Sequence, residues 1–480
     1  MTLSGTITPG EFALSAADEQ RLLERLEEAA SRARRHGRTV LGAVTVELDA
    51  AVDPAQVVIA SREGGEPWFC CEQPERERAA LATLGSVVTL EASGPRRFDE
   101  VAGRWRELAR DAACDAPPGP ADSGPLAVGG FAFADEGGNA PHWAGFAPAS
   151  LHVPEVVVSR RGEAVLLTLC AAAEPGDEPR ELATLLAARA ARLSSRPLPL
   201  VDPDPAVRAR VTGAMPPEHY EDAVARAAER IRAGDLEKVV LAREVQVHAS
   251  RPHDAPAIYG LLREAFTGCH VIAVGRGGKT FLAASPELLV RRQGLRASTL
   301  ALAGSIGRSS DPATDDHLGE QLMRSGKDRE EQAIVTRRIV RTLSPRSVWV
   351  TAPEEPVLAR VANIQHLATP IRAQLREPVS AIELAGLLHP TPAVGGEPRE
   401  AATPLIPALE GLDRGWYAGP VGWTDVNEDG EFCVALRCSL LDGEVARCYA
   451  GVGVVRDSDP VAELAETEVK LQALLPVLAT

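Results

Sequence analysis

Helical and strand-like segments follow one another irregularly in the second half of this 480-residue chain, and this order restricts the possible folds. A helical pattern over 219–233 leads to a strand-like run at 238–247 and a helix at 256–265, and several strand-like runs then follow without a helix between them. A strict alternation of strand and helix would build a parallel sheet, whereas strands that follow one another favour antiparallel pairing. The sequence therefore predicts an α+β fold or a complex α/β layer fold.

The remaining elements follow from periodicity and from turn signals. Four prolines between 194 and 205 make this segment the best candidate for an internal boundary, dividing 1–205 from 206–480. We expect the two parts to form one intertwined domain. The other predicted elements are a helix over 16–36 capped by Ser15, strands at 39–48, 56–59, 87–90 and 126–133, three short strands between 270 and 292, one long helix over 318–343, strands at 421–424, 431–440, 446–449 and 451–455, and a closing helix from Pro460.

The composition excludes several classes of partner. The net charge is −16 and no long run of Lys and Arg occurs, so nucleic acid is not an expected partner. No stretch of about 18 apolar residues is long enough to span a membrane, and the first residues lack the basic and apolar regions of a signal peptide. The eight cysteines follow neither zinc-site nor disulfide spacing, as is typical of free thiols in a reducing compartment. We therefore expect a cytoplasmic protein with no membrane partner.

Lysine is rare in this chain. Only four of the 51 basic residues are lysines, and none of them lies in the first 237 positions. Arginine cannot lose its proton in a protein, whereas lysine can. Two explanations of this scarcity are open. Either the genome simply favours arginine codons, or lysine is kept only where an ammonium group must titrate or a compact charge must fit. The four are Lys238, Lys279, Lys327 and Lys470.

The closing helix carries two acids and a lysine on one face. Glu463, Glu466 and Lys470 are spaced at i, i+3 and i+7, so they align along the helix beside its leucine-rich face. Carboxylates at such a buried edge need a cation, and oxygen-only ligation suits a hard ion such as magnesium. A solvated acidic face is the alternative interpretation.

Two further carboxylates fall in apolar surroundings. Glu331 shares a helix face with Ile334 and Val335, where an unpaired carboxylate is costly. It is therefore expected either to bind a metal or to form an ion pair with Lys327 or an arginine. Glu287 lies between two strand-like apolar runs, where burial would raise its pKa and let it act as an acid.

Glycines and histidines mark further candidate positions. Gly304 in ALAGS and Gly453 in AGVGVV expose backbone N–H groups that suit carboxylate binding, although turn and packing roles are equally open. AGVGVV lacks the spacing of a dinucleotide fingerprint, which excludes a Rossmann site. His366 and His389 are both flanked by apolar residues, as in satisfied core histidines. For His366 the context favours a site wall or a hydrogen-bond donor over a base.

Taken together, these segments resemble the chorismate-utilising enzymes, and within that family the isochorismate synthases. The matching segments span about 230 residues in one order, while the first 200 residues match loosely. There GGFAF at 129–133 resembles the longer, menaquinone-type members. The resemblance implies antiparallel sheets packed in layers with flanking helices. The segments are EKVVLAR (237–243), ASPELLV (284–290), ALAGS (301–305), SGKDREEQ (325–332), QHLATPI (365–371), HPTPAVGG (389–396), RGWYAGPVGW (414–423), GEFCVALR (430–437) and AGVGVVRDSDPVAELAETEVK (450–470).

The resemblance also implies a role for each matching residue. Among the catalytic residues, Lys238 matches the base that activates water, Glu287 the acid that protonates the leaving C4 hydroxyl, and His366 the site histidine of the family. Mg²⁺ is the implied cofactor. The implied metal ligands are Glu331 and Glu466, with Glu463 nearby, and the implied substrate-binding residues are Gly304, Tyr417, Arg437, Gly453 and Lys470.

The implied activity is that of an isomerase that converts chorismate reversibly to isochorismate, by attack of water at C2 and loss of the C4 hydroxyl, for menaquinone biosynthesis. A salicylate synthase and a siderophore-pathway isochorismate synthase are the alternatives. Similar anthranilate synthases carry Gln in place of Lys238, and aminodeoxychorismate synthases carry a nucleophilic lysine in place of Ala303, which argues against the amination branch. We therefore expect chorismate as the substrate, no glutaminase subunit, and a monomer or homodimer.

Overall fold

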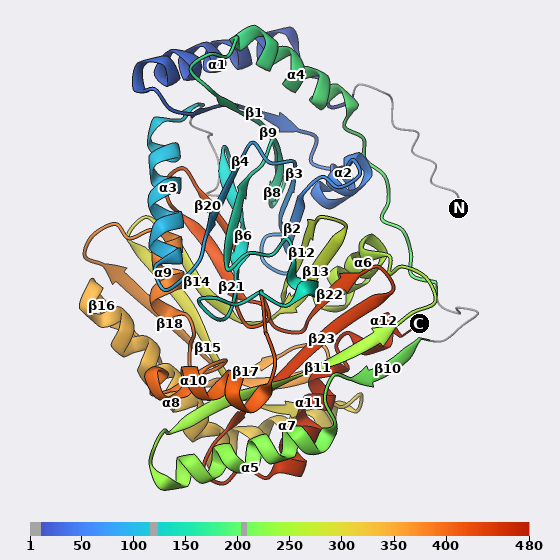
Figure 1. The fold of residues 1–480 in the computed structure, drawn as a ribbon, viewed down its shortest axis with the longest axis vertical. Helices are drawn as coiled ribbons and strands as arrows, with labels where there is room; N and C mark the ends of the chain where they lie inside the picture. Colours follow the sequence, from blue (N-terminus) through green and yellow to red (C-terminus); the bar gives the residue numbers. More distant parts are fainter. Residues whose placement is uncertain (1–10, 116–122, 203–208, 480) are drawn as a thin grey trace.

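Two large β-sheets organise the chain in the computed structural model, which describes residues 11–115, 123–202 and 209–479. One sheet has 13 strands and the other has 10, and helices cover the outside (Figure 1). The strand pairs are antiparallel except for the short parallel pair of β1 with β5. The predicted fold of layered antiparallel sheets with flanking helices is confirmed.

The larger sheet contains the strand that begins at Lys238. Its neighbour on one side is β23, near the end of the chain, so two segments about 200 residues apart in sequence lie side by side. In order across the sheet the strands are β10 (Arg210–Gly213), β11 (Lys238–His248), β23 (Val445–Val454), β22 (Cys438–Asp442), β13 (Lys279–Ser285), β12 (His270–Arg276), β2 (Trp68–Gln73), β3 (Ala79–Leu84), β8 (Val156–Arg161), β9 (Ala164–Ala173), β1 (Val40–Leu48) and β5 (Ala113–Cys114), with β19 (Gly396–Glu397) paired to β11.

The smaller sheet is built around the long antiparallel pair of β15 and β18. Their register shifts between Ala303 and Ser305, which leaves Gly304 in a bulge with φ of +71°. In order the strands are β16 (Ser347–Thr351), β18 (Ile364–Leu375), β15 (Arg296–Gly307), β14 (Leu288–Gln293), β21 (Gly430–Val434), β20 (Pro420–Asp425), β6 (Leu126–Phe131), β7 (Ala149–Val153) and β4 (Val88–Ala92), with β17 (Val357–Arg360) paired to β18.

Helices close the two ends of the molecule and the outer faces of the sheets (Figure 1). Among the described residues, no helix combines the length and the apolar character needed to cross a bilayer. The helices are α1 (Ala16–His36), α2 (Pro54–Ser61), α3 (Arg97–Asp111), η1 (Pro141–Trp143), α4 (Pro179–Arg192), α5 (Pro217–Ala233), α6 (Ala255–Ala265), α7 (Pro312–Arg324), α8 (Gly326–Leu343), η2 (Ser344–Arg346), α9 (Ala381–Leu388), α10 (Arg399–Glu410), α11 (Pro460–Leu471) and α12 (Leu475–Leu478).

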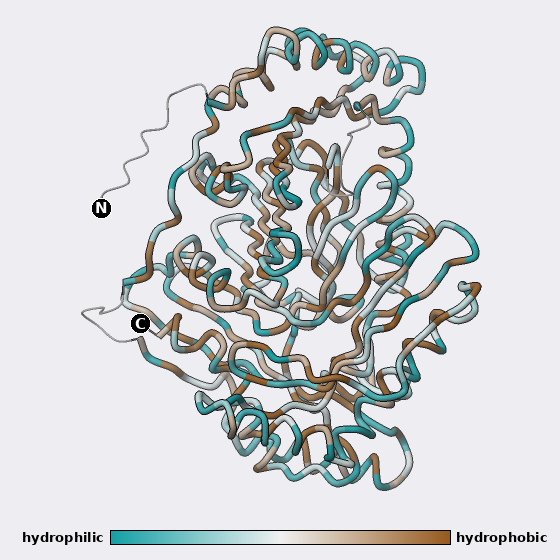
Figure 2. Tube along the Cα trace, turned by 180° about the vertical axis from the view of Figure 1, so that it is seen from behind, coloured by the Kyte–Doolittle hydropathy of each residue, from teal (hydrophilic) through white to brown (hydrophobic). Residues whose placement is uncertain are grey.

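The central strands are buried on both faces. In β12, Ile272 and Val274 belong to an apolar cluster shared with strands of the smaller sheet, whereas Val271 and Ala273 belong to a second cluster shared with α2 and α6. Successive residues of a strand point to opposite faces, so an uninterrupted apolar run is what a strand between two layers requires. Brown, hydrophobic segments accordingly gather in the central strands (Figure 2).

Strands from the two halves of the chain interleave in both sheets. β2, from the first half, pairs with β12, and β6 pairs with β20. The described part of the proline-rich segment, 194–202, has no regular secondary structure; the rest of that predicted boundary, from 203, lies outside the described residues.

Most of the predicted elements are confirmed, and α1 shows why. The Ser15 hydroxyl accepts a hydrogen bond from the N–H of Asp18, and Gly37 ends the helix with φ of +66°. The strand predicted at 56–59 is wrong, because this segment is helix α2. The Asp53 side chain caps that helix and Pro54 occupies its first turn, which fixes a short apolar run as helical.

Two long predicted elements are each broken in the structure. The single helix expected over 318–343 is two helices, α7 and α8, because Ser325 leaves the helical conformation and caps α8 through the N–H of Asp328. The single strand expected over 431–440 is split into β21 and β22 by Arg437, whose φ is +47°. In the opposite sense, the two strands predicted at 446–449 and 451–455 form one continuous strand, β23. The two breaks lie beside residues of the pocket described below.

Candidate active site

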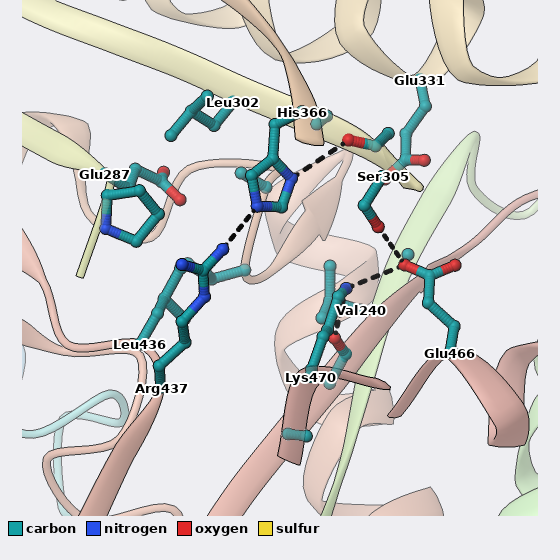
Figure 3. A pocket seen from close by; sticks show the side chains of 18 of the residues that line it. Val240, Glu287, Leu302, Ser305, Glu331, His366, Leu436, Arg437, Glu466 and Lys470 are labelled. Carbon is teal, nitrogen blue, oxygen red and sulfur yellow. Dashed lines mark hydrogen bonds and ion pairs between the residues drawn. The ribbon is translucent and has the colours of Figure 1, made fainter. Parts of the chain in front are cut away.

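One pocket gathers most of the predicted site residues, which reach it from β15, β18, α8, β23, α11 and the turns before β14, β20 and β22 (Figure 3). Lys238 and Glu463 are not part of its wall; Lys238 forms an ion pair with Glu331, which lines the pocket, and Glu463 forms one with Lys327. The predicted residues that line the pocket are Glu287, Gly304, Glu331, His366, Tyr417, Arg437, Gly453, Glu466 and Lys470.

Lys238 lies at the start of β11 and is completely buried. Its Nζ is 2.8 Å from Oε1 of Glu331. The neighbouring strand β23 presents Gly453 at this point, and a Cβ there would overlap both Glu331 Oε1 and Lys238 Cε. The glycine is therefore required by packing, since any larger residue would fill the space of the Lys238–Glu331 pair.

Glu287 lies between β13 and β14 and is 3% exposed. Burial raises its pKa to about 8, although Lys238, a hydrogen bond with Thr391, and Lys470 each act to lower it. At neutral pH this carboxyl group therefore keeps its proton and can donate it. In Figure 3 it lies on the opposite side of His366 from Glu331 and Glu466. The pocket thus has a protonated acid in its wall, and a buried lysine lies directly behind Glu331.

His366 on β18 is held between two partners. Nη2 of Arg437 is 2.8 Å from its Nε2, and its Nδ1 is 3.2 Å from the carbonyl oxygen of Gly304. A guanidinium group can only donate, so Nε2 accepts, and Nδ1 carries the proton and donates it to Gly304. Burial, with Arg437 and Lys470 nearby, lowers the pKa of His366 well below its usual value. The imidazole is therefore neutral and fixed in one tautomer, which suits it to orient Arg437.

Four neighbouring acids, here called the acid cluster, form two i, i+3 pairs, and one member of each pair, Glu331 and Glu466, lines the pocket. Glu463 and Glu466 lie on α11, as predicted, and Asp328 and Glu331 lie on α8. Asp328 is a member that the sequence reasoning missed, although its spacing from Glu331 repeats that of the α11 pair. Burial raises the pKa of Asp328, and the charges of Glu331 and Glu466 raise it further. The acids therefore repel one another across the gap between the two helices.

Three of these acids each have a lysine partner, and these are three of the four lysines in the chain. The alternative that Glu331 pairs with Lys327 does not hold, because Lys327 reaches a different acid. The pairs, with their Nζ–Oε1 distances, are Lys238–Glu331 at 2.8 Å, Lys327–Glu463 at 2.7 Å and Lys470–Glu466 at 2.9 Å.

The acid cluster has the donor chemistry of a hard-cation site. In the part of the chain that the structure describes, no three His, Cys, Asp or Glu side chains are grouped closely enough to hold a metal ion as they stand. The donors are nevertheless carboxylate oxygens alone, which magnesium prefers. Burial raises the pKa of both Asp328 and Glu463, and the charges of neighbouring acids raise it further; a bound cation would relieve that repulsion. The residues present therefore fit such an ion.

The remaining wall of the pocket carries groups suited to an anionic ring. Lys470 donates to Glu466 and to the carbonyl oxygen of Gly451. The Tyr417 ring stacks on that of Tyr449, with centroids 5.3 Å apart. Ser305, which the sequence reasoning also missed, donates from its hydroxyl to Oε1 of Glu466 at 2.5 Å. It directly follows Gly304 in a segment that was examined only for its glycine.

The family model described as "Chorismate binding enzyme" matches residues 25–479. Two curated relatives align over most of the chain. The salicylate biosynthesis isochorismate synthase of Pseudomonas aeruginosa is 38% identical over 94% of this chain and 93% of its own length. The isochorismate synthase MenF of Bacillus subtilis is 35% identical over 74% of this chain and 75% of its own length.

Solved structures share the fold. The menaquinone-specific isochorismate synthase MenF of Escherichia coli superposes with a TM-score of 0.77 at 26% identity, covering 95% of this chain and all (100%) of that one. The putative 2,3-dihydroxybenzoate-specific isochorismate synthase DhbC of Bacillus anthracis superposes with a TM-score of 0.69 at 29% identity, covering 88% of this chain and 99% of that one.

Proposed function

Because this chain belongs to the chorismate-binding enzymes, we propose that it is an isochorismate synthase, an isomerase that converts chorismate reversibly to isochorismate. The observation that carries the proposal is the combination of Glu287 in the pocket wall with Lys238 buried directly behind Glu331 of the same wall. Glu287 has a pKa of about 8 and so holds a proton at neutral pH, and Lys238 is a buried residue of the kind that can accept one. An exchange of hydroxyl positions on one ring needs such a donor and such an acceptor.

The reaction adds a hydroxyl group from water at C2 and removes the one at C4, so it needs no oxidant or reductant. In its neutral form, Lys238 takes a proton from a water molecule as the oxygen of that water bonds to C2 of the ring. The two ring double bonds shift by one position each, the C4–O bond breaks, and Glu287 gives its proton to the departing hydroxyl, which leaves as water. In the reverse direction the two residues exchange their roles. The placement of Glu287 away from Glu331, the partner of Lys238, supports this division of labour.

The substrate carries two carboxylates, and the pocket supplies matching cations. Arg437, oriented by His366, and Lys470 line the wall, with Tyr417 beside them. Gly304, in its bulge, and Gly453 also line the pocket, and backbone N–H groups at glycines are suited to bind a carboxylate. In this assignment His366 is a positioning residue for Arg437 and does not itself exchange a proton with substrate.

Magnesium is the cofactor that the acid cluster suits. Glu331 and Glu466 would hold it, with Glu463 and Asp328 beside them. Bound there, the ion would supply positive charge to a substrate carboxylate in a protein whose net charge is −16. Lys238 and Glu287 still carry out the proton transfers.

Two alternatives differ by their products. A salicylate synthase would go on to eliminate pyruvate from isochorismate, and an amination-branch enzyme would need ammonia. The pathway that the product enters is a separate question, and we propose menaquinone biosynthesis. The E. coli relative is named for that pathway, whereas the P. aeruginosa relative is named for salicylate biosynthesis. We also propose a cytoplasmic enzyme that needs no glutaminase subunit.

The test starts from each end of the reaction. Purified protein with Mg²⁺ is given chorismate or isochorismate, the products are separated by chromatography, and pyruvate is followed with a coupled dehydrogenase. We expect each compound to yield the other, with an equilibrium constant near unity and little pyruvate. Stoichiometric pyruvate and salicylate would support the salicylate-synthase alternative. A product formed only with ammonium salts would overturn the proposal, and Glu287→Gln serves as the inactive control.

A further inference from the structure

The ion pair between Lys327 and Glu463 joins the two helices that carry the acid cluster. Lys327 is the second residue of α8, and Glu463 lies in the first turn of α11. The Nζ–Oε1 distance is 2.7 Å. The two side chains differ sharply in exposure, since that of Lys327 is 40% exposed and that of Glu463 is 2% exposed.

This asymmetry separates Lys327 from the other two lysines at the cluster. Lys238 is completely buried, so it cannot leave Glu331 for solvent. Lys470 is tied to a second acceptor, the carbonyl oxygen of Gly451. Lys327 has a long flexible side chain that is 40% exposed, so its ammonium group can swing into water.

The carboxylate that Lys327 would leave behind cannot stay alone. Glu463 is buried, and an unpaired buried charge is strongly unfavourable. Glu466, one turn further along the same helix, adds the repulsion of a second carboxylate. A cation that takes the place of Lys327 would remove this cost, and the neighbouring carboxylates of Glu331 and Glu466 suit a divalent ion.

We propose that Lys327 is an exchangeable counter-cation of the acid cluster, which neutralises Glu463 when no divalent ion is bound and competes with that ion for the carboxylate. This inference rests on the magnesium site of the proposed function. It assigns Lys327 the task of keeping α8 and α11 together in the metal-free protein, at the cost of weaker metal binding.

The test measures binding of Mg²⁺ alone. Wild type, Lys327→Gln and Lys327→Met are stripped with EDTA and dialysed, and MgCl₂ is titrated in by calorimetry. We expect the Kd for Mg²⁺ to fall by about 3- to 10-fold in both variants, because a competitor and a like charge are removed. The Tm of the metal-free variants should drop, and the rise in Tm on adding Mg²⁺ should be larger than in wild type.

Lys279→Gln is the matched control, because it removes the same charge from the fourth lysine. Lys279 pairs with Asp442, a 45% exposed residue, and does not line the pocket. Its variant should bind Mg²⁺ within about twofold of wild type. Lys327→Arg, which keeps the charge, should also stay close to wild type.

The outcomes separate this inference from the function on which it rests. An unchanged or higher Kd in the Lys327→Gln and Lys327→Met proteins, with normal binding by wild type, removes the role of Lys327 and leaves the magnesium site intact. An equal fall in Kd for Lys279→Gln also overturns it, because net charge alone would then explain the effect. No binding by wild type would overturn both the magnesium site and the counter-cation.

Discussion

Nε2 of His366 lies 2.8 Å from Nη2 of Arg437 and must accept its hydrogen bond, because a guanidinium group has no acceptor. The single proton of the ring is on Nδ1, directed at Gly304. Together with the lowered pKa, this makes His366 a neutral support whose protonation does not change across the working pH range of an enzyme.

His366→Gln should therefore disturb binding more than chemistry. We expect KM for chorismate to rise by roughly 10-fold and kcat to fall less, because Arg437 loses the partner that orients it. Steady-state kinetics as a function of pH provide the measurement. The pH profile should keep its shape, whereas the loss of one limb in the variant would mean that His366 is the group that titrates.

Glu287 should set a limit on activity at high pH. Its pKa is raised to about 8, so the acid form is present below that pH and is lost above it. We expect kcat/KM, which reports the free enzyme, to decline above pH 8, and Glu287→Gln to reduce kcat by roughly 10²- to 10⁴-fold. A profile that stays flat to pH 9.5 would remove Glu287 as the acid.

The same shift has a consequence for stability. In the unfolded chain Glu287 ionises near pH 4.3. Between that pH and about 8 the folded state binds the extra proton, so this residue makes the free energy of unfolding fall as the pH rises. Glu287→Gln should flatten that dependence, which denaturant unfolding at pH 5, 6.5 and 8 would measure.

Lys238→Arg should be almost as inactive as Lys238→Ala. Arginine keeps the positive charge beside Glu331 but cannot accept a proton, so we expect kcat to drop by roughly 10²- to 10⁴-fold in both variants. Circular dichroism and the Tm would confirm that the arginine variant is folded. An active Lys238→Arg enzyme would falsify the base role and leave Lys238 as the counter-ion of Glu331.

Activity should depend on a divalent ion held by the acids of α8 and α11. Removal of one carboxylate, as in Glu466→Gln, should weaken Mg²⁺ binding by roughly 10- to 100-fold, and Glu331→Gln combined with Glu466→Gln should abolish turnover. Turnover in EDTA, compared with turnover after Mg²⁺ is restored, is the direct measurement. Normal turnover by the double variant would show that the acids have another role.

Gly453→Ala should inactivate the enzyme by 100-fold or more, because its Cβ would overlap Glu331 and Lys238. Gly326→Ala is the control. Gly326 is the first residue of α8, and apart from its chain neighbours and its own helix backbone no atom of the described residues lies within 4 Å of a Cβ placed there. The activity of Gly326→Ala should therefore stay within about twofold of wild type. Comparable losses in the two variants would point to a general packing defect.

Local signals predicted most elements of this fold. The cap at Ser15 and the periodicity behind it predicted α1 to the residue, whereas the apolar run of α2 was assigned to the wrong class. A run of four residues has no clear period, and there the Asp53 cap decides. The break at Ser325 was hidden because the helical pattern continues across it, and the bend at Arg437 depends on a strand arrangement that is not encoded locally.

The sequence predicted which residues belong to the site better than it predicted which of them contact one another. Lys238, Glu287 and Glu331 were selected because each is unusual in its own segment. The partner of each acid depends on which strands and helices meet, so the contact between Lys238 and Glu331, 93 positions apart, could not be derived from spacing. Asp328 could have been predicted from the sequence, because it stands three residues before Glu331 just as Glu463 stands three residues before Glu466.

The pairing of β2 with β12 and of β6 with β20 has a consequence for any attempt to divide the protein. A chain cut in the segment between 194 and 202 would leave β12 and β20 each with a bare edge of unsatisfied N–H and C=O groups. Such edges recruit other strands, so the later fragment expressed alone would be prone to self-association although it holds all the proposed catalytic residues. Strands β2 and β6 of the first half thus protect the edges of β12 and β20 in the second half. We therefore expect the later fragment to be soluble only when it is produced together with the first.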